Sequence, residues 1–70
     1  MKLNFNKAQI ELMNTMGFNF DVSGVLSDDQ ILEIDKKVSD YFARHGLDTN
    51  DRVNEIGLIC ESIMDILGDL

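Results

Sequence analysis

Helix start signals constrain this chain more than any other feature of its sequence. Two of them are capping boxes, in which a polar cap residue and the residue three positions later each bind the other's backbone N–H group. These pairs are Asn6 with Gln9 and Ser27 with Gln30. A third start lies within Asp48-Thr49-Asn50-Asp51, where every residue caps well, so the sequence leaves the cap position open. We therefore predict three helices.

Glycines mark where these helices are expected to end. Gly17 and Gly46 each follow a helical segment and precede an apolar residue, which is the pattern of a helix stop in the left-handed conformation. Glycine suits such a stop because it has no side chain to oppose that backbone conformation. The first two helices are therefore expected over residues 7–16 and 28–45, and the third is expected to end at Gly68.

The apolar faces of the second and third helices differ in width. The second helix has one narrow stripe, made of Ile31, Ile34, Val38, Tyr41 and Phe42. The third has a wider face, made of Val53, Ile56, Gly57, Cys60, Ile63, Met64 and Leu67. Ile59, Ile66 and Leu70 extend that face to about half of the helix circumference. Either the first helix and the loop after it cover this surplus, or another chain does so, for example in a homodimer through the third helix.

The segment between the first two helices allows two interpretations. Phe18, Phe20 and Val22 alternate with polar residues, as in a short strand, and Leu3 and Phe5 alternate in the same way. Two such pieces could pair as a minimal hairpin, but so short a ladder has little stability of its own, and an extended loop that places aromatic residues in the core is favoured. The sequence thus predicts an all-α fold: a compact three-helix bundle forming a single domain over residues 1–70, with an extended loop or minimal two-stranded hairpin between the first two helices.

The charge balance limits the partners that this chain can have. Thirteen acidic and six basic side chains give a formal net charge of −7. Such a chain repels nucleic-acid phosphates and anionic membrane surfaces, and it favours partners with basic surfaces. The first six residues lack the apolar run of a signal peptide, and no apolar stretch approaches the length of a membrane span. We expect no direct binding to nucleic acid or membrane, and a cytoplasmic location.

Few residues suit catalysis or metal binding. His45, the single histidine, falls in the expected last turn of the second helix, where its charge suits the negative end of the helix dipole. Cys60, the single cysteine, falls in the middle of an apolar face, where a thiol is buried and inert. The sequence has no tandem Cys or His spacing for zinc, and the residues from Asp48 onward lack the ligand order of a calcium loop. We expect no enzymatic activity, no metal and no cofactor.

One short motif resembles a known family. Met16-Gly17-Phe18, with Met13 and Ile10 three and six positions before Met16, resembles the loop of the ubiquitin-associated domain. That family is a three-helix ubiquitin-binding module, so the resemblance implies an exposed Met16–Phe18 surface that binds ubiquitin. It covers residues 10–18 only, and the next helix starts later and is longer here than in the family. A helix stop at Gly17 explains the same residues by backbone geometry.

The candidate partner-binding residues are apolar positions that the predicted core does not need. They are Leu32, Leu58, Ile59, Ile66 and Leu70. Leu32 and Leu58 fall off the buried stripes, and the other three lie at the margin of the third helix. We expect a small acidic cytoplasmic protein-binding or regulatory module whose partner is another protein with a basic surface. Two alternatives remain: a ubiquitin-associated-like module, and an acidic decoy that occupies a nucleic-acid-binding site on a partner protein.

Overall fold

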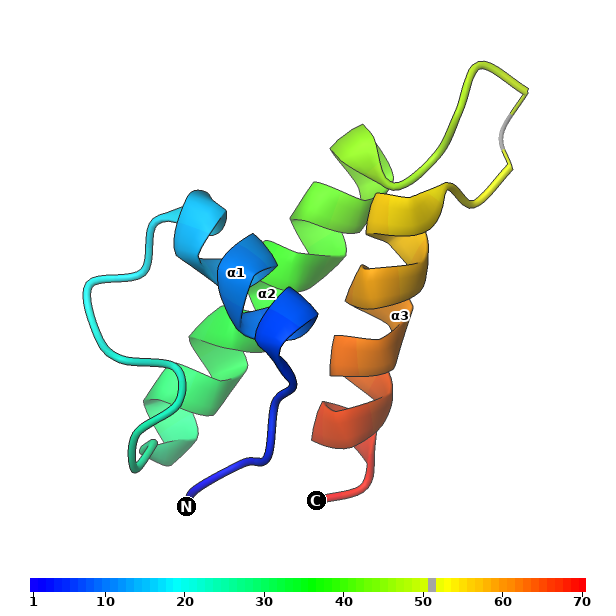
Figure 1. The fold of residues 1–70 in the computed structure, drawn as a ribbon. Helices are drawn as coiled ribbons and strands as arrows, with labels where there is room; N and C mark the ends of the chain where they lie inside the picture. Colours follow the sequence, from blue (N-terminus) through cyan, green and yellow to red (C-terminus); the bar gives the residue numbers. More distant parts are fainter. Residues whose placement is uncertain (51) are drawn as a thin grey trace.

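The chain folds as a three-helix bundle. A computed structural model describes residues 1–50 and 52–70. The helices are α1 (Lys7–Met16), α2 (Asp28–His45) and α3 (Glu55–Gly68), and they make the all-α fold that the sequence predicts. α3 packs mainly against α2 and to a lesser extent against α1, which crosses the pair (Figure 1).

The capping boxes of α1 and α2 form as predicted. The Gln9 backbone N–H donates to Asn6 Oδ1 at 2.8 Å, and the Asn6 N–H donates to Gln9 Oε1 at 2.7 Å. Ser27 and Gln30 make the same two bonds at the start of α2, at 3.2 and 2.9 Å. Gly17 has a φ of 82°, so α1 ends in the predicted left-handed stop. Local side-chain chemistry therefore sets both ends of α1 and the start of α2.

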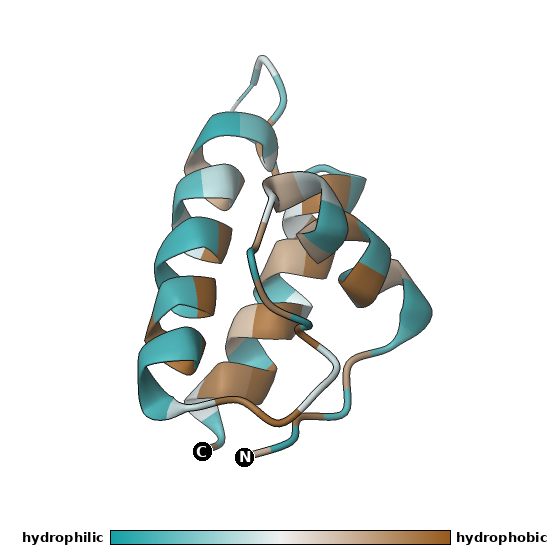
Figure 2. Cartoon of the chain, turned by 90° about the vertical axis from the view of Figure 1, so that its left-hand side faces the viewer, coloured by the Kyte–Doolittle hydropathy of each residue, from teal (hydrophilic) through white to brown (hydrophobic). Residues whose placement is uncertain are grey.

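The core combines helical stripes with side chains from the loops. Its buried apolar members are Leu3, Met13, Val22, Leu26, Ile34, Val38, Cys60 and Ile63. Figure 2 shows the hydrophobic side of α2 turned toward the other helices and its hydrophilic side turned outward. Three of the eight core residues lie outside the helices. The N-terminal segment and the loop after α1 therefore complete a core that the helices alone leave open.

The segment between α1 and α2 is an extended loop. Phe18 and Phe20 pack against the core with their ring centroids 5.3 Å apart. The only pairing near this loop within the described residues is an isolated antiparallel bridge between Lys2 and Val25, so residues 18–22 form no hairpin with Leu3 and Phe5. The favoured loop interpretation is confirmed.

The start of α3 differs from the prediction. The N-cap is Asn54, whose side chain accepts a hydrogen bond from the Gly57 N–H at 2.8 Å, so the start predicted within residues 48–51 is wrong. Asp48 instead accepts from the backbone N–H groups of Asn50 and Arg52, at 2.8 and 3.0 Å, and turns the loop. Asp51 lies outside the described residues.

Val53 was predicted to belong to the apolar face of the third helix, and this is also wrong. It precedes α3, forms an isolated antiparallel bridge with Leu47, and is 40% exposed. The pairing of Leu47 with Val53 draws the two ends of the α2–α3 loop together. Asp48, a good capping residue, is therefore used to turn the connection, and α3 begins after Asn54, where that connection ends.

Gly46 ends α2 without the predicted left-handed stop, since its φ of −86° and ψ of −4° are right-handed. A glycine is needed at position 46 because the start of α3 lies too close to leave room for a side chain. A Cβ at Gly46 would lie 2.7 Å from the Phe42 carbonyl oxygen and 3.0 Å from the Gly57 Cα, and a Cβ at Gly57 would overlap the Gly46 carbonyl oxygen. Asn54 joins the same backbone, because its N–H donates to the Gly46 carbonyl at 2.9 Å and its Nδ2 to the His45 carbonyl at 2.9 Å. We call this arrangement of Gly46, Asn54 and Gly57 the glycine contact.

The core predicts a large effect of truncating its central residues. Ile34→Ala and Ile63→Ala should each lower the free energy of unfolding by about 2–5 kcal/mol, because both side chains are fully buried and their loss leaves a cavity. Leu32→Ala is the matched control on the exposed side of α2, and it should change stability by less than about 0.5 kcal/mol. Urea denaturation followed by circular dichroism measures all three, and equal effects would contradict the helical registers.

The glycine contact predicts a difference between two glycines of α3. Gly57→Ala should destabilise the chain by about 1–3 kcal/mol, because the new methyl group overlaps backbone atoms that cannot turn away. Gly68→Ala is the control, since a Cβ there meets nothing within 4 Å, and it should be neutral or stabilise by up to about 1 kcal/mol. Thermal melts of the two variants compare them directly. A Gly57→Ala variant as stable as Gly68→Ala would mean that the helices do not approach this closely.

Candidate partner-binding groove

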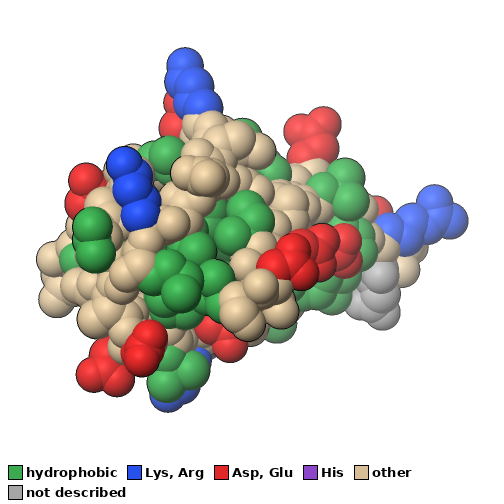
Figure 3. Space-filling model, turned by 90° about the horizontal axis from the view of Figure 1, so that it is seen from below, with side chains coloured by type: hydrophobic (Ala, Val, Ile, Leu, Met, Phe, Trp, Pro, Cys, Tyr) green, Lys and Arg blue, Asp and Glu red, His purple; other side chains and the backbone are tan. Residues whose placement is uncertain are grey.

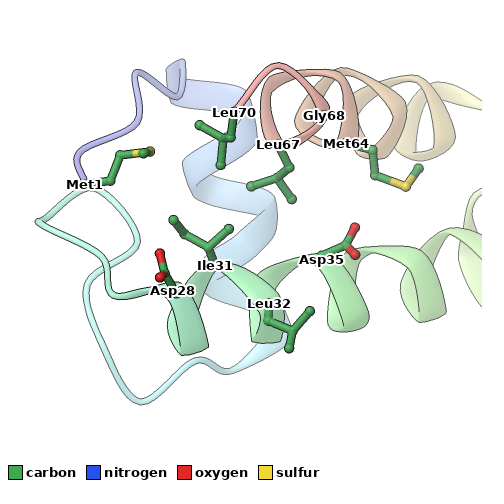
Figure 4. Close-up of a pocket in the computed structure, with 9 residues that line it drawn as sticks. All are labelled: Met1, Asp28, Ile31, Leu32, Asp35, Met64, Leu67, Gly68 and Leu70. Atoms are coloured by element: carbon green, nitrogen blue, oxygen red, sulfur yellow. The ribbon is translucent and has the colours of Figure 1, made fainter.

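The two long helices enclose a groove at the end of the bundle opposite the glycine contact. α2 and α3 lie close together near Gly46 and Gly57 and diverge toward the start of α2 and the end of α3 (Figure 1). The groove between the diverging ends has a volume of about 410 Å³. Side chains from both helices and from the first residue point into it (Figure 4). Its shape therefore follows from the angle at which the helices separate.

The lining of the groove is apolar at its floor and at its walls. Ile31 of α2 and Met64 and Leu67 of α3 are half-buried and pack against the core, so they form the floor. The walls are more exposed and consist of Met1 (57% exposed), Leu32 (52%) and Leu70 (56%). Viewed from this end, hydrophobic side chains gather in the middle of the face, with acidic side chains beside them (Figure 3). The chain thus leaves apolar surface uncovered at this end of the bundle.

The polar side chains of the groove are acidic. Asp28 and Asp35 line it from α2, and no Lys or Arg side chain is among its described lining residues. Gly68 lies at the end of α3, where the carbonyl groups of the last turn carry the negative end of the helix dipole. The start of α2 at Asp28 carries the positive end of its own dipole, so the two helix ends oppose each other, and the two carboxylates decide the sign of the side-chain charge. The N-terminal ammonium of Met1 keeps its charge and donates to the Leu26 carbonyl at 2.6 Å. The groove therefore favours a positively charged ligand.

The structure brings together two of the five candidate residues from the sequence. Leu32 and Leu70 both line the groove. Leu58 is 58% exposed on α3 and lies outside the groove. Ile59 and Ile66 are half-buried, pack against the core and lie outside the groove.

Helix α1 supplies cover for the margin of α3. The side chain of the buried Gln9 donates from Nε2 to Ser62 Oγ at 2.8 Å, and Ser62 lies between Ile59 and Ile66 on the same side of α3. This bond agrees with the intramolecular alternative, in which the first helix and the loop after it cover the surplus. Leu70, the third residue at the margin of this apolar face, lies beyond the end of α3 and stays exposed.

Three residues of the groove were missed by sequence reasoning. Met1, Asp28 and Asp35 line it but are not among the candidate residues from the sequence. The spacing of Asp28 and Asp35, with the off-stripe Leu32 between them, was the available signal. It could not show that the end of α3 lies opposite, because that placement depends on how the helices cross.

The motif Met16-Gly17-Phe18 forms a braced helix stop. Lys37 of α2 donates from Nζ to the Gly17 carbonyl at 3.1 Å, and the same ammonium lies 4.8 Å from the centroid of the Phe18 ring. Met16 and Phe18 are half-buried and pack against the core. These residues thus join α1 to α2, and Met16 and Phe18 are only partly exposed, whereas the resemblance to the ubiquitin-associated domain implies an exposed surface.

Cys60 and His45, the residues best suited to chemistry, differ in their exposure. Cys60 is fully buried, and burial raises the pKa of its thiol, so the reactive thiolate is disfavoured. His45 is exposed at the end of α2, with its ring 4.6 Å from that of Tyr41. Across residues 1–50 and 52–70, no three side chains of His, Cys, Asp or Glu are grouped so that they could hold a metal ion.

Comparisons of the chain with protein-family models, with curated proteins and with solved structures find no match. Of the helices that the structure describes, none has the length and apolar character needed to cross a bilayer.

Proposed function

We propose that this chain is a small acidic protein-binding or regulatory module without catalytic activity, and that it binds its partner through the α2–α3 groove. One observation carries the proposal. Three of the six large apolar side chains that are exposed in the described residues, Met1, Leu32 and Leu70, line this single groove. Scattered exposed leucines need no explanation, but a contiguous apolar surface with polar edges is typical of an interaction site.

The chemistry of the partner follows from charge. The net charge of −7 and the carboxylates of Asp28 and Asp35 favour a protein with a basic surface, which they attract before contact and orient on docking. A volume of about 410 Å³ accommodates a few partner side chains, and the exposed walls suit a protein surface better than an enclosed small molecule. The same acidic balance supports a cytoplasmic module that binds neither nucleic acid nor membrane directly.

The remaining alternatives use other surfaces. An acidic decoy for a nucleic-acid-binding site depends on carboxylates and does not require Leu32. A ubiquitin-binding module depends on Met16 and Phe18, which pack against the core here. Substitutions can distinguish each alternative from binding through the groove.

Leu32→Glu tests the groove, and Leu58→Glu is its matched control. Both leucines are exposed helix residues, and only Leu32 lines the groove. In affinity capture from the source cells, we expect a protein retained by the wild type and by Leu58→Glu but lost with Leu32→Glu. The purified partner should then bind at least tenfold more weakly to Leu32→Glu, because a carboxylate replaces an apolar anchor.

Equal binding of that purified protein to wild type and Leu32→Glu would contradict a role of the groove. Saturable binding of ubiquitin that is lost on Phe18→Ala would favour the ubiquitin-associated alternative. Circular dichroism of each variant establishes that the helices are intact.

A further inference from the structure

We infer that the groove takes an amphipathic helix of the partner that carries two Lys or Arg residues seven positions apart, with apolar residues between them. This inference rests on the proposed function and specifies the ligand of the same site. It starts from the order of residues along α2, where Asp28 and Asp35 flank Ile31 and Leu32 and all four line the groove.

The elements around the groove favour a helix as its occupant. A bound strand would need an open sheet edge, and the described residues contain only isolated β-bridges, none of which involves a lining residue of the groove. The groove instead lies between the side chains of two diverging helices. A third helix can lay its apolar ridge between them, as helices do when they pack in globular proteins.

The spacing of the carboxylates sets the register of that helix. Seven residues make two helical turns, so Asp28 and Asp35 project from the same side of α2, about 10.5 Å apart along its axis. Both are exposed, so they can reach a partner's cations without being buried as isolated charges. A partner helix that lies along α2 presents basic residues at positions i and i+7 with the same spacing.

The apolar residues of the partner fall between its two cations. Positions i+3 and i+4 of such a helix face the same way as i and i+7, so they meet Leu32 and reach the floor at Ile31 and Leu67. Apolar contact and charge therefore select the same segment of a partner.

A second copy of this chain does not supply such a helix. Its only basic residues seven positions apart are Lys37 and Arg44. Lys37 donates to the Gly17 carbonyl, and Arg44 pairs with Asp40 at 3.1 Å. Each copy would also bring a net charge of −7 to the interface. Charge complementarity thus favours a different, basic protein.

Two synthetic helical peptides of the same composition test the register. The matched peptide has Lys at i and i+7 with Leu at i+3 and i+4, and the shifted peptide keeps the leucines and moves both lysines to the opposite face. Isothermal titration is run against the wild type, Asp35→Lys and the control Glu11→Lys. The two substitutions change the net charge equally, but Glu11 is an exposed residue of α1 outside the groove.

We expect the matched peptide to bind saturably and about fivefold or more tightly than the shifted one. Asp35→Lys should weaken the matched peptide by about five- to tenfold, because an attraction becomes a repulsion, whereas Glu11→Lys should weaken it less than about twofold. Replacing by Glu whichever of the two peptide lysines faces position 35 should restore binding to Asp35→Lys.

Four results would overturn the inference. Equal binding of the two peptides, or equal weakening by the two substitutions, would mean that net charge alone attracts the peptides. The absence of saturable binding at millimolar concentration would also overturn it, while a Leu32-dependent partner in the capture experiment would leave the proposed function standing. A dimer in sedimentation velocity that Leu32→Glu converts to monomer would assign the groove to a second copy.

Discussion

The glycine contact between the end of α2 and the start of α3 determines how the rest of the chain can be arranged. Backbone meets backbone there, because neither Gly46 nor Gly57 has room for a Cβ. Asn54 adds two hydrogen bonds to the carbonyls at the end of α2 while it caps α3. One short segment thus ends one helix, begins the next and fixes their approach. Because α2 and α3 are in contact at this point, they can separate only toward the start of α2 and the end of α3.

The groove is the consequence of that divergence in a chain of 70 residues. Helix α1 packs against α2 and α3, and Gln9 bonds α1 to Ser62 of α3. The N-terminal segment and Leu26 close part of the open end, and the floor residues reach the core. Leu32 and Leu70 stay exposed at this end of the bundle. A small domain with a single core has little chain to spare for such cover.

Sequence reasoning succeeded where local chemistry decides the structure. The capping boxes at Asn6 and Ser27 and the stop at Gly17 gave the bounds of α1 and the start of α2, because each depends on residues within one turn. It failed at the start of α3, where four good capping residues precede Asn54, and the helix begins only after the loop has returned to α2. Gly46 fitted the pattern of a local stop, but its role is in the contact with Gly57. The sequence points to Leu32 because this leucine falls off the buried stripe of α2. The place of Asp35 in the groove depends instead on where α3 lies, which the sequence does not show.

The account rests most directly on the close approach of Gly46 and Gly57, and nuclear Overhauser spectroscopy can measure it. If a Cβ at Gly46 would lie only 3.0 Å from the Gly57 Cα, the α-protons of these two glycines are near neighbours although eleven positions separate them in sequence. We expect a strong cross-peak between them in the folded, assigned protein. Its absence, with the cross-peaks within α2 and α3 intact, would show that the helices do not meet at these residues, and the groove at their opposite ends would lose its structural basis.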